Sequence, residues 1–186
     1  MKIVITEIKK YQQFYPYTVA LVGAKTEHHL NYMACAWHSA FSFDPPLFGI
    51  LISKKRFTHK LIQEAGEFSV NFLSFEKAKL SSRMGRKSGY EMDKVKEFKV
   101  SLSPSRIIQT PIIEEAYVCF ECKLIDLKTY GDHDLFVGKV LVIHQEEKAF
   151  GADGVLEPKK VNPLLYLGSD FYITINPETL RHVLPD

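Results

Sequence analysis

Short apolar runs recur through the first half of the chain and predict β-strands. Runs of this length with few polar residues are typical of strands that are buried on both faces. We therefore predict strands at 18–24 (TVALVGA), 31–37 (NYMACAW), 47–53 (LFGILIS) and 68–73 (FSVNFL).

Two longer segments in the second half alternate apolar and polar residues, as strands with one buried face do. They span 116–128 (AYVCFECKLIDLK) and 134–145 (DLFVGKVLVIHQ), and Tyr130-Gly131-Asp132 lies between them as a turn. This spacing predicts a long antiparallel hairpin. Shorter apolar pieces follow at 164–167 and 171–175.

Helical patterns are few. The apolar residues of 58–65 fall at helix spacing and Gly66 follows as a stop signal, while 76–84 predicts a second helix that ends at Gly85. The polar segment 86–93 predicts a loop. Six or more strands with so few helices predict a mainly β fold, an antiparallel barrel with helices packed outside, because a barrel leaves no exposed strand edges.

Composition is that of a single soluble globular domain. The chain has 186 residues, 46% apolar and 25% charged, enough to bury a core without disulfides or a metal. Its net charge of +2 argues against a nucleic-acid partner, which would need a concentrated basic face. No apolar run approaches the about 20 residues that cross a bilayer. An early charged N-terminus and three cysteines lead us to expect a cytoplasmic protein without a membrane partner.

The stretch 31–47 (NYMACAWHSAFSFDPPL) combines small and hydroxyl residues with a rigid Pro45-Pro46 corner. Small side chains on a strand leave backbone N–H and C=O groups within reach of a flat ligand. The stretch is therefore a candidate cofactor platform. The alternative is an ordinary strand and turn.

A second candidate runs from a strand end into a helix start at 53–59 (SKKRFTH). Ser53 and Thr58 offer hydroxyl groups, Arg56 offers a guanidinium, and the helix start offers free N–H groups, which together suit a phosphate. Helix capping by Thr58 explains one of these residues but not the others. Ser88 lies among glycines and basic residues, and either adds to a phosphate pocket or belongs to a mobile loop.

Two further features are candidates for a redox, metal or ligand-binding role. Cys119-x-x-Cys122 has redox or zinc spacing but lies in an alternating strand without further ligands at matching spacing, so we predict core cysteines and no metal site. His133, in the run GDHD, is either an exposed turn histidine or a histidine at a barrel mouth that contacts a ligand. Strand alternation predicts that the flanking aspartates point away from it. His144 shows no motif and is interpreted as a surface residue.

In their order, the motifs of the chain resemble the flavin reductase-like domain family, the FMN-binding split-barrel group that includes flavoredoxins and ferric reductases. Each piece is weak alone, but the ordered set is specific and covers nearly the whole chain. The matching pieces are Tyr15-Pro16 with TVALVGA, NYMACAWHSAFSFDPPL, SKKRFTHKLI at 53–62, GEFSVN at 66–71, Ser88-Gly89 with Asp93-Lys94, Glu121-Cys122, Gly131-Asp132-His133 with VGKV at 137–140, and PLLYLG at 163–168.

The resemblance implies one FMN-binding domain over 1–186, a split barrel, and a homodimer with FMN near its interface. The residues that it places at the flavin ring and ribityl chain are Met33, Ala34, Cys35, Ala36, Trp37 and Ser39. Those that it assigns to the phosphate are Ser53, Arg56, Thr58, His59, Arg86 and Lys87. It places His133 and Tyr166 beside the substrate and requires no side chain as an acid or base.

The activity that follows is oxidoreduction, with hydride taken from NADH or NADPH and electrons passed to free flavin, a ferric chelate or a protein. Two alternatives stay open. One is a flavoredoxin-type carrier that holds FMN tightly and has no nicotinamide site. The other is a split-barrel binding protein that has lost flavin.

Overall fold

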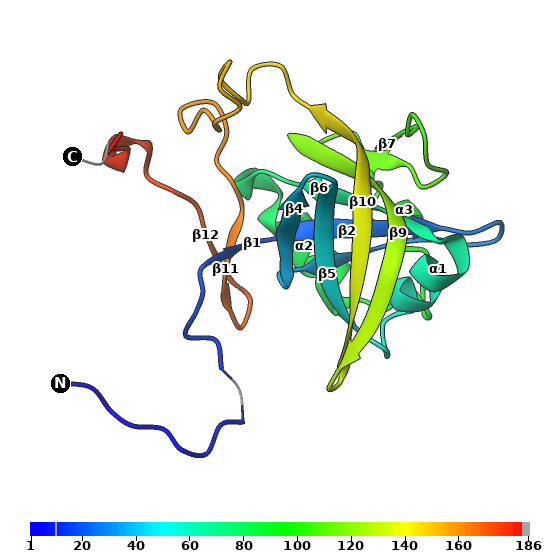
Figure 1. Cartoon of the computed structure of the whole chain (residues 1–186), viewed down its shortest axis with the longest axis horizontal. Coiled ribbons are helices and arrows are strands. Elements are labelled where there is room, and N and C mark those ends of the chain that lie inside the picture. The colour runs from blue at the N-terminus through cyan, green and yellow to red at the C-terminus, as the bar shows by residue number, and fades with distance from the viewer. Residues whose placement is uncertain (10, 184–186) are drawn as a thin grey trace.

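The computed structural model describes residues 1–9 and 11–183 and places most of the strands in one curled antiparallel sheet (Figure 1). Buried side chains such as Val22, Phe68 and Phe136 fill the inside of the curl. The mainly β prediction is confirmed. The seven strands, in their order across the sheet, are β3 (Leu30–Cys35), β2 (Ala20–Lys25), β6 (Glu67–Phe72), β9 (Val118–Tyr130), β10 (His133–Gln145), β5 (Pro46–Ser53) and β4 (His38–Phe43).

The barrel is split where the two ends of this sheet meet. β3 and β4 are the end strands, and the short link Ala36-Trp37 connects them in the chain. β3 lies next to β5 without a strand ladder between them in the described part of the chain. A backbone hydrogen bond from the Leu51 N–H to the Trp37 carbonyl, at 2.9 Å, joins the two sides. The resulting split barrel is the architecture that the resemblance implied.

The predicted hairpin is confirmed. β9 and β10 have thirteen residues each and pair from Tyr130 opposite His133 to the far ends of both strands. Gly131 takes a left-handed φ of 60° at the turn, a conformation that glycine adopts without strain. On its other side β10 pairs with β5, so that His133 stands opposite Ser53. Two predicted site residues that are far apart in the sequence are thereby brought together.

Short helices cover the outside of the sheet. α1 (Phe57–Ala65) packs on β2 and β3, and α2 (Ala78–Arg86) and α3 (Lys94–Glu97) pack on β3. α1 ends where predicted, because Gly66 takes a left-handed φ of 65° and its N–H donates to the Ile62 carbonyl at 2.8 Å. The predicted end of the second helix at Gly85 was wrong. A short 3₁₀ turn, η1 (Phe75–Lys77), precedes α2, and α2 continues past Gly85 to Arg86.

Gly85 serves close packing instead of stopping the helix. A Cβ at this position would lie 3.1 Å from the Cβ of Ala34, so the absence of a side chain lets α2 approach β3. The two small residues therefore bring the helix against the strand that was predicted as a cofactor platform.

Other strand boundaries also differ from the prediction. The segment predicted as one strand at 18–24 begins instead as β1 (Tyr17–Thr18), which pairs in a small sheet with β11 (Leu165–Gly168) and through it with β12 (Phe171–Ile173). β4 was not predicted as a strand, because most of its side chains are exposed and give no apolar alternation. β7 (Leu102–Ser103) and β8 (Ile112–Ile113) form a further short pair, and η2 (Pro177–Thr179) is a 3₁₀ turn near the end.

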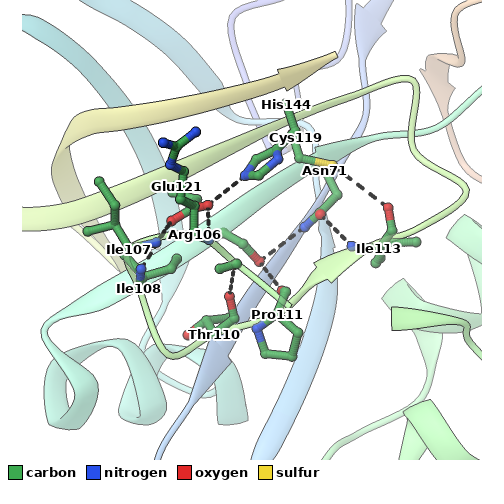
Figure 2. A network of polar contacts seen from close by, with 12 residues as sticks. Asn71, Arg106, Ile107, Ile108, Thr110, Pro111, Ile113, Cys119, Glu121 and His144 are labelled. Carbon is green, nitrogen blue, oxygen red and sulfur yellow. Dashed lines mark hydrogen bonds and ion pairs between the residues drawn. The ribbon is translucent and has the colours of Figure 1, made fainter. Parts of the chain in front are cut away.

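Two buried carboxylates on neighbouring strands hold the loop between β7 and β8, and Figure 2 shows the one on β9, Glu121. Glu121 accepts hydrogen bonds from the backbone N–H groups of 106–108, at 2.7–3.0 Å. Glu67 accepts from those of 109–110, at 2.6 and 3.2 Å. The surface prediction for His144 was wrong, because its side chain is half-buried and its Nε2 donates to Glu121 at 2.5 Å. Burial alone would raise the pKa of Glu121, but these donors outweigh it and hold the pKa below its ordinary value.

The Cys-x-x-Cys pair is part of the core, as predicted. Cys119 and Cys122 are both buried free thiols of β9. Burial raises the pKa of Cys119 to about 12 and raises that of Cys122 further, so neither forms a thiolate readily. Within residues 1–9 and 11–183, no three His, Cys, Asp or Glu side chains are grouped to hold a metal ion, and no helix has the length and apolar character to cross a membrane.

Candidate functional site

Three cavities meet at the split of the barrel, and Arg56 lines all of them. The largest, about 330 Å³, lies between β3, α2 and the β11–β12 hairpin and is called here the outer cavity. The second, about 160 Å³, lies between β3, β5 and His133 and is called the aromatic cavity. The third, about 40 Å³, lies at the start of α1 and is called the cationic cavity. Ala34 is shared by the first two, and Met33 by the last two.

The cationic cavity concentrates positive charge. Lys55, Arg56, Lys87 and Lys94 line it, and no carboxylate belongs to its described lining. The other lining residues are Asn31, Met33, Phe57, Thr58, Met84, Gly85, Ser88 and Gly89. Four cations that converge without an acidic partner create a site for an anion of high charge density, such as a phosphate.

The start of α1 adds to this site. Arg56 is the N-cap residue, and no side chain caps the first turn. The Thr58 hydroxyl instead accepts a hydrogen bond from Nδ2 of Asn31 at 2.7 Å, so helix capping does not explain this threonine. The uncapped N–H groups and the helix dipole therefore remain directed at the cavity, which favours a bound anion.

Lys94 belongs to the Asp93-Lys94 piece of the family resemblance, but the sequence assigned it no role at the site. Its side chain lies in the first turn of α3 and is only 2% exposed, and its ammonium group donates to the Met84 carbonyl at 2.8 Å. Burial, followed by the nearby charge of Arg56, lowers its pKa to about 8. In the sequence Lys94 is one lysine among several in a polar region, and only the packing of α3 against β3 buries it.

Gly89 explains how the loop after α2 can close over the cationic cavity. A Cβ at this position would lie 2.5 Å from both Oδ1 of Asn31 and Cδ1 of Phe57. Only glycine therefore lets the loop backbone approach β3 and the start of α1 so closely. This contact brings Lys87 and Ser88 to the same cavity as Arg56.

The aromatic cavity places aromatic side chains next to the edge of β3 that pairs with no strand in the described part of the chain. Met33 to Trp37 line one side, and Tyr15 and His133 lie near the other. The indole N–H of Trp37 donates to the Tyr15 hydroxyl at 3.1 Å, and the Trp37 and His133 rings lie 4.8 Å apart. Cys35 is buried, its thiol donates to the Trp37 carbonyl at 3.4 Å, and burial raises its pKa to about 12. This thiol therefore stays protonated at neutral pH.

His133 is oriented by a neighbour that strand alternation failed to predict. Its Nδ1 donates to Oδ1 of Asp132 at 2.8 Å, so the expectation that both flanking aspartates point away from it was wrong for Asp132. Asp132 lies in the turn before β10, where the alternation of a strand does not apply. With Nδ1 engaged in this bond, Nε2 is the nitrogen left to contact a ligand.

Charged and polar side chains line the outer cavity. Arg86 and Asp170 form a two-bond ion pair at its rim, with Nε of Arg86 3.0 Å from Oδ1 of Asp170. Tyr166 of β11 lines it and contacts Tyr15 edge to face, with ring centroids 5.4 Å apart. The ion pair fixes the β11–β12 hairpin against the end of α2.

Most residues predicted from the sequence gather here. The cavities are lined by Met33, Ala34, Cys35, Ala36, Trp37, Ser53, Arg56, Thr58, Arg86, Lys87, His133 and Tyr166. Among the described residues, Ser39 and His59 line none of the three. The Ser39 hydroxyl donates to the Ala40 carbonyl at 3.1 Å on the exposed strand β4, and His59 is buried against Asp134.

Comparison with known proteins gives a consistent answer. Residues 12–174 match the model of the flavin reductase like domain. The chain is 37% identical over 171 residues to an uncharacterised protein of Pyrococcus abyssi, which covers 92% of this chain and 97% of that protein. An FMN-binding protein from Thermus thermophilus, solved with bound 1-cyclohex-2-enone, superposes with a TM-score of 0.87 at 34% identity and covers 98% of this chain and 99% of its own. A flavoredoxin from Methanosarcina acetivorans superposes with a TM-score of 0.83 at 28% identity, and the match covers 95% of this chain and 92% of the flavoredoxin.

Proposed function

The chain belongs to the flavin reductase like domain family, and we propose that it is an FMN-dependent oxidoreductase that takes hydride from NADH or NADPH and passes electrons to an acceptor. The acceptor is free flavin, a ferric chelate or a protein. The whole chain forms one functional domain. Its flavin chemistry has the support of relatives that are an FMN-binding protein and a flavoredoxin.

The observation that carries this proposal is the position of the cationic cavity beside Met33 to Trp37, at the edge of the end strand β3. The donor set fits FMN, because a phosphate needs concentrated positive charge and N–H donors, and a flavin ring needs a flat surface with backbone groups within reach. Gly85, Gly89, Ala34 and Ala36 keep the space between the two parts free of bulky side chains.

Each part of the site has its own task. Lys55, Arg56 and Lys94 neutralise the phosphate, together with the N-terminus of α1. Trp37 provides an aromatic wall that is held in place by Tyr15, and His133 offers Nε2 to the substrate. FMN, when bound, supplies the redox chemistry, and the protein binds it, orients it and sets its electrostatic surroundings.

One experiment separates this proposal from its two alternatives. The purified protein is titrated with FMN by absorbance, and the loaded protein is then mixed without oxygen with NADH and with NADPH in a stopped-flow instrument. We expect saturable FMN binding and rapid loss of the absorbance band near 450 nm with at least one nicotinamide. A protein that binds FMN but is not bleached at a useful rate is a flavoredoxin-type carrier. A protein that takes up no FMN contradicts both flavin functions.

The protein functions as a homodimer. Its N-terminal segment carries large exposed apolar side chains, those of Ile3, Val4, Ile5 and Ile8. Figure 1 shows this segment as an extended trace that runs away from the barrel. A contiguous apolar segment of this kind marks an interaction surface, and a second copy of the chain is the partner that the family resemblance implies.

A further inference from the structure

A single buried carboxylate lies behind the turn that lines the cationic cavity. Asp134 follows His133 on β10, and its side chain is 6% exposed. Its Oδ2 accepts a hydrogen bond from Nε2 of His59 at 2.8 Å. Nζ of Lys54, whose side chain is 55% exposed, lies 3.5 Å from Oδ1 of the same carboxylate, an ion pair without a hydrogen bond, and donates to the Thr129 hydroxyl at 3.3 Å. Asp134 lines none of the three cavities described here.

The two partners of Asp134 bracket the residues that face the cavity. Lys54 precedes them and His59 follows them, and Lys55, Arg56 and Thr58 lie in between. The residues at the two ends of this segment, Lys54 and His59, therefore both contact the same carboxylate, which belongs to another part of the chain. A turn that is held at both ends loses most of its freedom before a ligand arrives, which lowers the entropy cost of binding.

Asp134 and His59 are themselves held firmly in the fold. β10 pairs with β5, and Asp134 stands opposite Ile52, one residue before Ser53. The His59 side chain is 8% exposed, and its ring packs edge to face on Phe136 with centroids 4.9 Å apart. Burial alone would raise the pKa of Asp134, but hydrogen bonds and the nearby charges outweigh it and hold the pKa below its ordinary value. The carboxylate is therefore ionised at neutral pH and shielded from competing water.

The charge of Asp134 has the wrong sign to attract a phosphate. Acting through space, a carboxylate behind an anion site opposes anion binding. Any contribution of Asp134 to phosphate binding must therefore come from the geometry that it imposes on the turn. These two effects have opposite signs, so an experiment can tell them apart.

We propose that Asp134 is a positioning residue, which holds residues 54–59 through Lys54 and His59 in the shape that binds the cofactor phosphate. The inference rests on the proposed function, since the phosphate is that of FMN. Asp134 touches neither phosphate nor flavin. It acts through the turn and through the first turn of α1.

The test compares FMN with riboflavin, which has the same ring system but no phosphate. Asp134→Asn keeps the size of the side chain and removes the charge, and Asp126→Asn removes the same charge from an exposed position on β9. Dissociation constants are measured by flavin fluorescence. For Asp134→Asn we expect FMN to bind at least about tenfold more weakly while riboflavin changes by less than about twofold. For Asp126→Asn we expect both ligands to bind as in the wild type.

Hydrogen exchange of the flavin-free protein gives a second readout that does not depend on FMN. Asp134→Asn should raise the exchange rates of amides 54–59 and leave those of β2 and β6 unchanged. If Asp134→Asn does not fold, Asp134→Glu keeps the charge and displaces the carboxylate, and the same two results are expected.

Each result either supports or overturns the positioning role of Asp134. Equal weakening of FMN and riboflavin, or tighter FMN binding, overturns the positioning role. Unchanged exchange at 54–59 overturns it as well, even if the wild type proves to bind FMN. A wild type that binds neither flavin contradicts the proposed function instead, and the phosphate part of this inference falls with it. Exchange data that still show a clamped turn would then leave Asp134 with a purely structural task.

Discussion

Lys94 is a positively charged side chain that is almost fully buried. Its ammonium group has one described hydrogen bond, to the Met84 carbonyl, and shares its cavity with three other cations. Burial and the nearby positive charge of Arg56 lower its pKa to about 8, which means that the charged form of Lys94 is destabilised in the flavin-free protein. A bound phosphate removes that cost. Lys94 is thus the residue whose surroundings argue most directly for an anionic ligand.

The Lys94→Met variant tests this reading. Methionine keeps the length of the side chain but cannot pair with a phosphate. We expect FMN binding to weaken by roughly ten- to a hundredfold, the equivalent of about 1.5–3 kcal/mol for a charged hydrogen bond. Lys96→Met, an exposed neighbour on α3, serves as the control. Isothermal titration calorimetry provides both values, and equal affinities in the two variants would remove Lys94 from the site.

The second residue-scale prediction concerns His133. Its position beside Trp37 in the aromatic cavity predicts a contact with the substrate and not with the phosphate. We expect His133→Ala to retain FMN affinity and to lower the rate of NADH or NADPH oxidation by about five- to tenfold, the loss of one hydrogen bond. His28→Ala, at an exposed position, is the control. An unchanged steady-state rate in His133→Ala would exclude the residue from the mechanism.

At the scale of elements, the loop between β7 and β8 depends on two carboxylates from β6 and β9. Five consecutive backbone N–H groups, those of 106–110, donate to Glu121 and Glu67, and Figure 2 shows the three that donate to Glu121. The loop has one buried apolar side chain, that of Ile108, and charge-assisted hydrogen bonds attach the rest of its backbone to the sheet. His144 completes the arrangement from the neighbouring strand.

Glu121→Gln should loosen this loop. The amide N–H₂ group of glutamine faces N–H donors where the carboxylate accepted from them, so we expect a loss of about 1–3 kcal/mol of unfolding free energy. Glu114→Gln, at an exposed position, should be neutral. Urea unfolding followed by tryptophan fluorescence measures both variants, and equal midpoints would show that the loop contributes little.

The same carboxylate gives a pH dependence with a definite sign. Because the pKa of Glu121 is lowered by folding, its stabilisation is complete above the ordinary value of 4.5 and is lost as the pH falls through the lower pKa of the folded state. The wild type should therefore lose stability in acid more steeply than Glu121→Gln. Parallel stability curves between pH 7 and pH 3 would contradict this assignment.

At the scale of the whole molecule, the N-terminal segment and the C-terminal part with β11 and β12 lie beside the barrel and not in it (Figure 1). Exposed apolar side chains lie on both parts, with Tyr11 and Phe14 on the first and Phe171 and Ile173 on the second. A single copy of the chain leaves these surfaces in water, which is costly for apolar area of this extent.

Removal of residues 1–9 should therefore weaken the proposed dimer. We expect light scattering coupled to size-exclusion chromatography to give a dimer mass for the full chain and a mass that falls toward the monomer on dilution of the truncated chain. Glu7→Gln, a polar change within the same segment, should leave the mass unchanged. A full chain that is monomeric at every concentration would contradict the dimer.

The sequence by itself determined the elements whose causes are local. Apolar runs and alternation predicted the strands around 20–25, 47–53 and 118–145, and Gly66 predicted the end of α1. The order of the motifs was enough to imply the split barrel, and most of the residues that it assigned to a flavin site line the three cavities. Where local signals misled, as at Gly85 and β4, the reason lay in contacts with another element or in exposure of most of a strand.

Only the tertiary structure decided which polar side chains are buried and with which partners. Lys94 reaches Met84 through the packing of α3, Asp134 meets His59 across 75 positions, and Glu121 pairs with His144 across the hairpin. Burial and charge pairing depend on contacts between residues that are far apart in the sequence, so they produce no periodic pattern along the chain. For this reason the sequence predicted the stretch 31–47 as a platform and placed Arg56 and Lys87 at the phosphate, whereas the role of Lys94 and the contacts of Asp134 became visible only in three dimensions.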